Sequence, residues 1–296
     1  MAAVEAQVQT LFALHGPRYR WLATITVMLG TMSVVLASTI INVAIPTIMV
    51  EFQLAQDQVH WLATGFLAAM TVGMLLNAWC AQRFGARGAY LLAMGLFIVV
   101  SLVGAVSEQF PLLVAARVGQ GLLAGLIQPL AMITIFQVFP YNRRGQAMGI
   151  YGLGVVLGPA IAPAIGGVLV DTLSWRAVFL VVLPACVVGM AMAWRYLPGK
   201  DREAPPLRLD TAGVLLLAVG MTAVLWGLAN GHRRGWVDPL LLAALPGGLI
   251  TLVLFVLWQR HTRQPLMDLR VFRYPGFTGS FLMSMVIGAG VFASTY

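Results

Sequence analysis

Nine long apolar segments follow one another along the chain, and they constrain its fold more than any other feature. They cover residues 21–46, 61–80, 89–106, 111–139, 146–170, 175–194, 211–229, 240–258 and 276–296. A run of about 20 apolar residues spans a bilayer as a helix, whereas a membrane β-barrel has short alternating segments. Only 9% of the residues are charged, against about 25% in a soluble domain. We therefore predict an all-α, polytopic membrane protein.

The basic residues are distributed unevenly between the loops. The net charge of +8 would by itself fit nucleic-acid binding. With a cytoplasmic N-terminus, however, 14 of the 18 Lys and Arg fall on the cytoplasmic side: Arg18, Arg20, Arg83, Arg87, Arg143, Arg144, Arg195, Lys200, Arg202, Arg208, Arg260, Arg263, Arg270 and Arg273. The opposite side has Arg176, Arg233 and Arg234. This positive-inside pattern predicts a multi-pass plasma-membrane protein with its N-terminus in the cytoplasm and no nucleic-acid partner.

Polar stretches divide the chain into five parts. We expect an N-terminal six-helix bundle at 1–196, a cytoplasmic linker at 197–210 and two additional membrane helices at 211–258. A second cytoplasmic link at 259–275 and the start of a C-terminal bundle at 276–296 follow. The last apolar run stops without a polar tail, so we expect a truncated chain, the alternative being a short final helix. No cleavable signal peptide is expected, because the first apolar segment is too long for a signal h-region.

No combination of residues typical of an enzyme lies inside the apolar segments. All ten Asp and Glu and all four His fall in tails, loops or predicted helix ends. Cys80 and Cys186 have neither a disulfide framework nor metal-ligand spacing. Paired carboxylates, metal clusters and nucleophile–base pairs are therefore missing from the interior. We predict that the protein is not an enzyme and requires no metal or cofactor.

Arg117 is the only charged residue deep inside an apolar segment. A charge in hydrocarbon costs from about 2.5 to more than 10 kcal/mol, and such residues usually face a bundle interior or a wet cavity. Gln120 follows three residues later, which places both side chains on one face of a helix. We predict a functional pair; the alternative is a structural arginine near a helix end that extends to the membrane interface.

Other interior residues are uncharged but polar, or unusually small. Polar residues of this kind are Ser38, Thr39, Asn42, Asn77 and Gln128, each of which could simply form an interhelical hydrogen bond worth about 0.6 kcal/mol. The fifth segment is rich in residues that loosen a helix or permit close approach: Gly154, Gly158, Pro159, Pro163, Gly166 and Gly167. Proline removes a backbone donor and the small-xxx-small spacing allows close packing. We predict a helix that can bend or rock against a neighbour; ordinary tight packing is the alternative.

These residues together resemble the motifs of the major facilitator superfamily, and within it the 14-helix drug:proton antiporter family of multidrug efflux pumps. Its fourth-helix motif, whose arginine is tied to proton coupling, is matched by Arg117, Gln120, Gly121 and Gly125. Its antiporter motif in the fifth helix is matched by Gly154, Gly158, Pro159, Gly166 and Gly167. The likeness extends through the whole chain.

Three further stretches carry the resemblance. The first-helix signature is matched at 38–46, including Ser38, Thr39, Asn42 and Pro46. The loop after helix two, which gates conformational change in the family, is matched by Gln82, Arg83, Gly85 and Arg87. The start of helix six is matched by Trp175, Arg176 and Phe179.

The sequence departs from the family pattern at two positions. The family usually has an aspartate in helix one where this chain has Ala37, and an acid in the gating loop where this chain has Gln82. The first change puts proton coupling through helix one in question, in agreement with the lack of any acid at the middle of a span.

The resemblance implies a secondary active transporter of the bacterial inner membrane that exports drugs or amphipathic small molecules by proton antiport. Arg117 would supply the buried charge and Gln120 would orient it. We expect substrate contacts from Asn42, Met70, Met74 and Gln128, chosen for polarity and for the adaptability of methionine. The implied partners are the lipid bilayer, a small-molecule substrate, protons and a periplasmic adaptor protein. The alternatives are a proton-independent or metabolite-specific exporter, suggested by Ala37, and a non-transporting fragment, suggested by the abrupt end.

Overall fold

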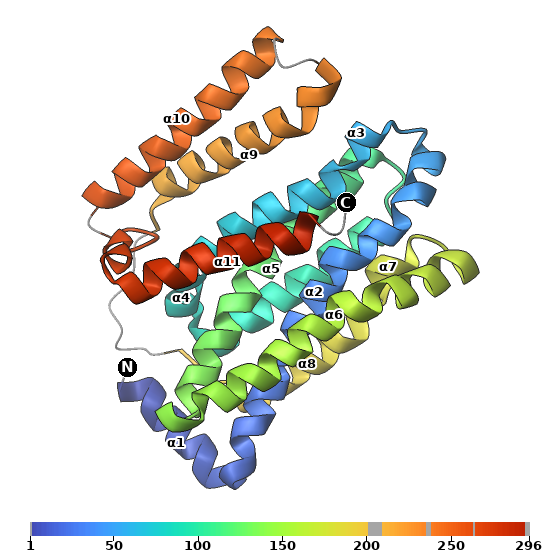
Figure 1. The fold of residues 1–296 in the computed structure, drawn as a ribbon. Helices are drawn as coiled ribbons and strands as arrows, with labels where there is room; N and C mark the ends of the chain where they lie inside the picture. Colours follow the sequence, from blue (N-terminus) through green and yellow to red (C-terminus); the bar gives the residue numbers. More distant parts are fainter. Residues whose placement is uncertain (1, 201–208, 235–237, 263, 294–296) are drawn as a thin grey trace.

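Every regular element in the computed structural model is a helix, in residues 2–200, 209–234, 238–262 and 264–293, which the structure describes (Figure 1). The longer helices are α1 (Ala2–His15), α2 (Tyr19–Phe52), α4 (Trp61–Ala105), α5 (Phe110–Val138), α6 (Arg144–Thr172), α8 (Leu183–Tyr196), α9 (Thr211–Arg234), α10 (Pro239–His261) and α11 (Pro275–Ala293). The short ones are η1 (Gly16–Arg18), α3 (Gln56–Val59), η2 (Tyr141–Arg143), α7 (Ala177–Leu180) and η3 (Leu269–Arg273).

Seven helical stretches among these residues are long and apolar enough to cross a membrane. The predicted all-α membrane fold is confirmed. The count is seven rather than nine for two reasons. The predicted segments 61–80 and 89–106 both fall in α4, and the apolar helix Pro275–Gly288 is shorter than the others.

Helix α4 consists of two helical halves joined at Gly85. This residue takes φ 76° and ψ 165°, which no helix interior uses. A positive φ favours glycine because it has no Cβ. The break lies in the predicted gating loop, so the bend of the chain and the motif coincide.

Helices α4 and α5 pack with their backbones almost in contact. A Cβ atom added at Gly121 would collide with the Phe66 carbonyl oxygen, and one added at Gly125 would collide with that of Met70. The Asn77 side chain donates a hydrogen bond from Nδ2 to the Leu126 carbonyl between the same helices. This contact fixes the register of α5 next to α4 and so places Arg117, one turn before Gly121.

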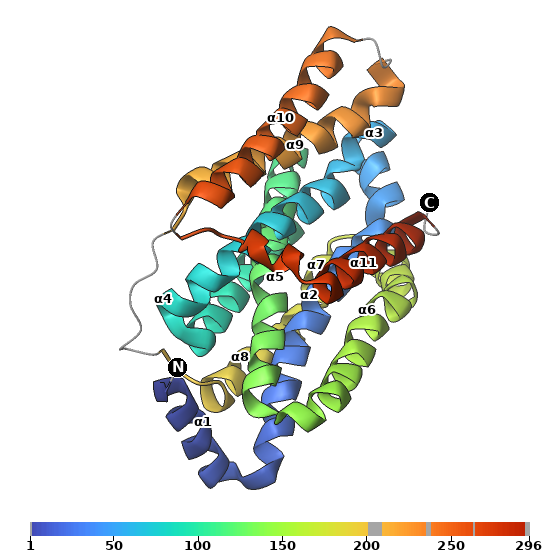
Figure 2. The same cartoon turned by 60° about the vertical axis from the view of Figure 1, so that its left-hand side comes forward.

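Helix α1 was not predicted, because its sequence has no apolar run of spanning length. It folds back from α2 across one end of the bundle (Figures 1 and 2). Gly16 makes the turn with φ 63°. Val8 is buried, and the Phe12 ring lies 4.8 Å from the Tyr19 ring in an edge-on contact. Burial of this small apolar face, rather than a spanning sequence, holds α1 in place.

Helices α9 and α10 form an antiparallel pair beside α4 in both views (Figures 1 and 2). Asp210 joins their ends, since its carboxylate accepts hydrogen bonds from Trp258 Nε1 (2.9 Å) and Gln259 Nε2 (2.8 Å). Residues 201–208 of the predicted linker and 294–296 of the last predicted segment lie outside the described residues. The division of the chain into domains stays a prediction.

Candidate functional site

Arg117 lies two turns into α5 and is 1% exposed. Its guanidinium is therefore enclosed by the protein and not exposed at its surface. The choice between a functional and a structural role for Arg117 stays a prediction. A charge at this depth requires polar partners, because hydrocarbon offers none.

Three acceptors and one aromatic ring surround the guanidinium. Arg117 Nε donates to the Leu62 carbonyl of α4 (3.0 Å), and Nη1 donates to the Ala37 carbonyl of α2 (3.2 Å). Nη1 also donates to Gln120 Oε1 (2.8 Å). The guanidinium carbon lies 4.3 Å from the centre of the Phe66 ring, a cation–π distance. One side chain on α5 thus connects three helices.

Gln120 continues the network to the second half of α4. Its Nε2 donates to Ser101 Oγ at 2.8 Å, and Gln120 itself is 1% exposed. With its oxygen toward Arg117 and its nitrogen toward Ser101, the amide has one orientation that satisfies both bonds. The pairing of Arg117 with Gln120 expected from their spacing is present, whereas Ser101, Leu62 and Phe66 were not identified from the sequence.

No carboxylate neutralises Arg117 within the described residues. Its Nη2 is buried and has no hydrogen-bond partner there. An ion pair elsewhere in the described residues joins Arg176 Nη1 to Glu51 Oε1 at 2.8 Å and does not involve Arg117. The family's usual aspartate position is Ala37, whose own backbone carbonyl accepts from Nη1. In the structure, Arg117 therefore contacts the residue that stands where the family usually has an acid.

The fifth-segment motif separates into two faces of α6. Gly154, Gly158 and Gly166 are buried against α2: a Cβ at Gly158 would lie 3.3 Å from Val35, and one at Gly166 would lie 3.0 Å from Ile40. Pro159 and Pro163 lie on the exposed face, and a Cβ at Gly167 would meet nothing within 4 Å. The glycines make the close contact with α2; the prolines do not.

The first-helix residues lie along α2. Ser38 donates to the Val35 carbonyl (2.7 Å), and Thr39 donates to the same oxygen (3.0 Å), so both hydroxyls bond within their own helix. Asn42 and Pro46 are exposed. Their spacing of four residues places Ser38, Asn42 and Pro46 on one face.

The four residues expected to contact substrate are not brought into one described pocket. Met70 and Gln128 are half-buried, whereas Asn42 and Met74 are exposed. None of them lines the pocket described below. Their role stays a prediction.

The gating loop packs against the segment that follows α8. A Cβ at Gly85 would lie 2.6 Å from the Lys200 backbone, so the two backbones touch. Arg87 donates from Nε to the Leu197 carbonyl (2.7 Å) and from its backbone N–H to the Pro198 carbonyl (3.0 Å). Arg83 is exposed. No feature of the sequence predicted that residues 197–200 would pack against this loop.

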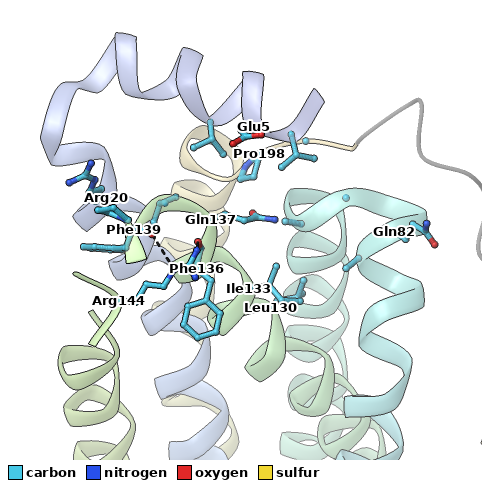
Figure 3. Close-up of a pocket in the computed structure, with 18 residues that line it drawn as sticks. Glu5, Arg20, Gln82, Leu130, Ile133, Phe136, Gln137, Phe139, Arg144 and Pro198 are labelled. Carbon is cyan, nitrogen blue, oxygen red and sulfur yellow. Dashed lines mark hydrogen bonds between the residues drawn. The ribbon is translucent and has the colours of Figure 1, made fainter. Parts of the chain in front are cut away.

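A pocket of about 650 Å³ opens at the same end of the bundle (Figure 3). Gln82 and Gly85 of the gating loop line it together with the end of α5, the start of α6 and helix α1. Figure 3 shows Glu5 beside α1, Arg20 and Arg144 at separate heights on one side of the pocket, and Gln82 on the opposite side. The pocket lies apart from Arg117, which does not line it.

A second polar cluster connects the end of α2 to the residues just before α7. Glu51, at the end of α2, accepts a hydrogen bond from Trp175 Nε1 and forms the ion pair with Arg176. The Trp175 ring packs edge-on against Phe179, 6.3 Å away. The family resemblance predicted a motif at Trp175, Arg176 and Phe179. Glu51 was not predicted, because it is 124 residues away from Trp175 in the chain.

The sequence matches the family described as "Major Facilitator Superfamily" over residues 27–296. The chain belongs to this family. The family consists of membrane transporters and not of enzymes, in agreement with the prediction from the sequence.

Two relatives show how much of a transporter is present. "Uncharacterized MFS-type transporter YhcA" of Bacillus subtilis is 32% identical over 92% of this chain and 51% of its own length. "Methylenomycin A resistance protein" of Streptomyces coelicolor is 31% identical over 90% of this chain and 56% of its own length. The chain thus spans about half the length of these relatives.

The fold is also that of solved transporters. The crystal structure of the peptide transporter POT in complex with sulfate superposes with a TM-score of 0.60, at 17% identity, over 86% of this chain and 56% of that one. At this identity the likeness concerns the fold alone.

Proposed function

We propose that this chain is the first part of a secondary active transporter of the 14-helix drug:proton antiporter type, which exports drugs or other amphipathic small molecules. The observation that carries the proposal is the buried Arg117 network, which connects α2, α4 and α5 around a charge without a carboxylate partner in the described residues. The printed name of the Streptomyces relative, a methylenomycin A resistance protein, supports drugs as substrates.

Arg117 would act as a fixed positive charge and not as the proton carrier, because a guanidinium does not deprotonate in proteins. It would stabilise a carboxylate that reaches it during transport and so favour the deprotonated form of that group. The described spans of this chain supply no such carboxylate. We expect it from the remainder of the transporter, which corresponds to the other half of the relatives' length.

The contact of α6 with α2 would provide the surface along which helices move. Transporters of this kind bind substrate between two halves that rock against each other. The glycine face at Gly154, Gly158 and Gly166 permits sliding of closely packed helices, and the exposed Pro159 and Pro163 would face another element. The N-terminus and the gating loop would lie in the cytoplasm, as the distribution of Lys and Arg predicts. Contact with a periplasmic adaptor protein also belongs to this proposal.

The direct test is efflux of a fluorescent dye from cells that express the full-length transporter. Arg117→Ala should abolish efflux at unchanged expression, whereas Arg143→Ala, which removes an exposed arginine, should leave it unchanged. Equal efflux by both variants would refute the assigned role of Arg117.

One observation favours a second candidate, a proton-independent exporter. Ala37 takes the place of the usual helix-one acid, directly next to Arg117. A protonophore that collapses the proton gradient should stop efflux under the first proposal. Continued efflux under that condition would establish the second.

A further inference from the structure

The pocket at the end of the bundle combines positive charge with an apolar wall. Arg20 from the start of α2 and Arg144 from the start of α6 line it, with Glu5 as the one acidic side chain among its lining residues (Figure 3). Leu130, a core residue, lies deeper along α5 in the same view. A volume of about 650 Å³ fits a small-molecule site, which typically encloses about 300–1,000 Å³.

In the part of the chain that the structure describes, neither of the two guanidinium groups has hydrogen-bond partners for all of its donors. Arg20 Nε is buried and has no hydrogen-bond partner among the described residues. Arg144 uses Nη2 for the Phe136 carbonyl (2.9 Å) and Nε for the Phe139 carbonyl (3.4 Å), which anchors the side chain at the end of α5. Guanidinium groups bind phosphate with paired, charge-assisted hydrogen bonds. The chemistry of this pocket therefore suits a phosphate group.

The surroundings indicate that the phosphate belongs to a lipid. The pocket lies where spanning helices begin and end, and Trp21 packs edge-on against Phe139 (5.5 Å) at the same level. Aromatic side chains of this kind collect at the depth of lipid headgroups. Ile133 and Phe136 are 37% and 43% exposed and continue the apolar surface down α5, where acyl chains would lie.

We propose that this pocket binds the phosphate group of an anionic phospholipid, with Arg20 and Arg144 as its ligands. Basic pockets between spanning helices are suited to such headgroups. Because α1 lies over the pocket, the bound lipid also joins α1 to the ends of α5 and α6. Lipid binding is distinct from export of a substrate, so it holds whether or not the protein transports drugs.

Native mass spectrometry of the full-length chain, purified in detergent with equal amounts of phosphatidylglycerol and phosphatidylcholine, tests the proposal. We expect phosphatidylglycerol to be retained preferentially. Loss of one arginine should lower that retention by about tenfold or more, the factor that corresponds to one hydrogen bond to a charged group. The variants are Arg20→Gln and Arg144→Gln.

The chain offers a matched control for each variant. Arg18→Gln and Arg143→Gln remove exposed arginines two residues and one residue away, neither of which lines the pocket, and should change retention little. Equal loss in variants and controls would mean diffuse charge attraction and would overturn the site. Because Arg144 also anchors α5, Arg20→Gln decides the outcome if Arg144→Gln lowers the melting temperature.

A further arm distinguishes lipid from free phosphate. Inorganic phosphate at millimolar concentration should not displace phosphatidylglycerol, since it lacks the apolar part that contacts α5. Displacement by inorganic phosphate, or equal retention of both lipids, would overturn the assignment of the site to an anionic lipid.

Discussion

Gln120→Leu is expected to destabilise the bundle through two specific hydrogen bonds. Gln120 Oε1 accepts from Arg117 Nη1 at 2.8 Å, and its Nε2 donates to Ser101 Oγ at 2.8 Å. Leucine has a similar size and remains compatible with a helix, so the change removes polar contacts with little loss of packing.

The magnitude follows from these two bonds. A hydrogen bond to a charged group contributes about 1.5–3 kcal/mol, and an amide–hydroxyl bond between membrane helices contributes about 0.6 kcal/mol. In the variant, Arg117 Nη1 keeps its hydrogen bond to the Ala37 carbonyl, so this donor still has a partner. We therefore expect Gln120→Leu to lower the free energy of unfolding by about 2–3.5 kcal/mol.

Reversible denaturation of the purified full-length transporter would measure this value, with Ser101→Ala and the double variant to complete a double-mutant cycle. Once Gln120 is leucine, Ser101 has lost its partner, so Ser101→Ala should then cost less than it does alone. The control is Gln137→Leu, which changes an exposed glutamine on the same helix and should shift stability by no more than about 0.5 kcal/mol.

Two results would refute this reasoning. Equal destabilisation by Gln120→Leu and Gln137→Leu would show that the network contributes nothing to stability. Strict additivity of Gln120→Leu and Ser101→Ala would show that the two side chains do not interact.

Three other predictions follow from the packing. Gly121→Ala should lower stability by about 1–3 kcal/mol, because its Cβ would collide with a backbone carbonyl of α4. Gly95→Ala, whose Cβ would lie 3.7 Å from a flexible methionine side chain, should be neutral or stabilising in the same melting experiment. Gly85→Ala should cost about 1 kcal/mol or more through its positive φ and slow dye efflux, and efflux at the wild-type rate would contradict the gating role. Glu51→Gln should lower the melting temperature and weaken its dependence on ionic strength, since it breaks the half-exposed ion pair with Arg176.

The sequence predicted the fold class because nine apolar segments allow no other arrangement in a membrane. The sequence also drew attention to Arg117, because a single charged residue inside an apolar run is evident without any structural knowledge, and the structure shows that this side chain is buried. The pairing with Gln120 followed from local helix geometry, which a spacing of three residues determines.

The pattern of apolar and polar residues could not predict contacts between segments that are distant in the chain. Arg117 binds the carbonyls of Leu62 and Ala37, which are 55 and 80 residues away in the chain. Backbone carbonyls are present at every residue, so no residue type marks them as ligands. Helix α1 was missed for a related reason, because a short helix held by a few apolar contacts does not need a spanning run.

The sequence by itself therefore determined that the chain crosses a membrane as helices, that its interior carries one charge, and which family motifs it retains. The tertiary structure alone decided which groups face that charge and which glycines are in close contact. It also decided that the gating loop rests on residues 197–200 and that two arginines share a pocket under α1. The physical reason is that hydrophobicity and helix periodicity are local properties of a sequence, whereas hydrogen-bond partners and close backbone contacts depend on how whole helices pack.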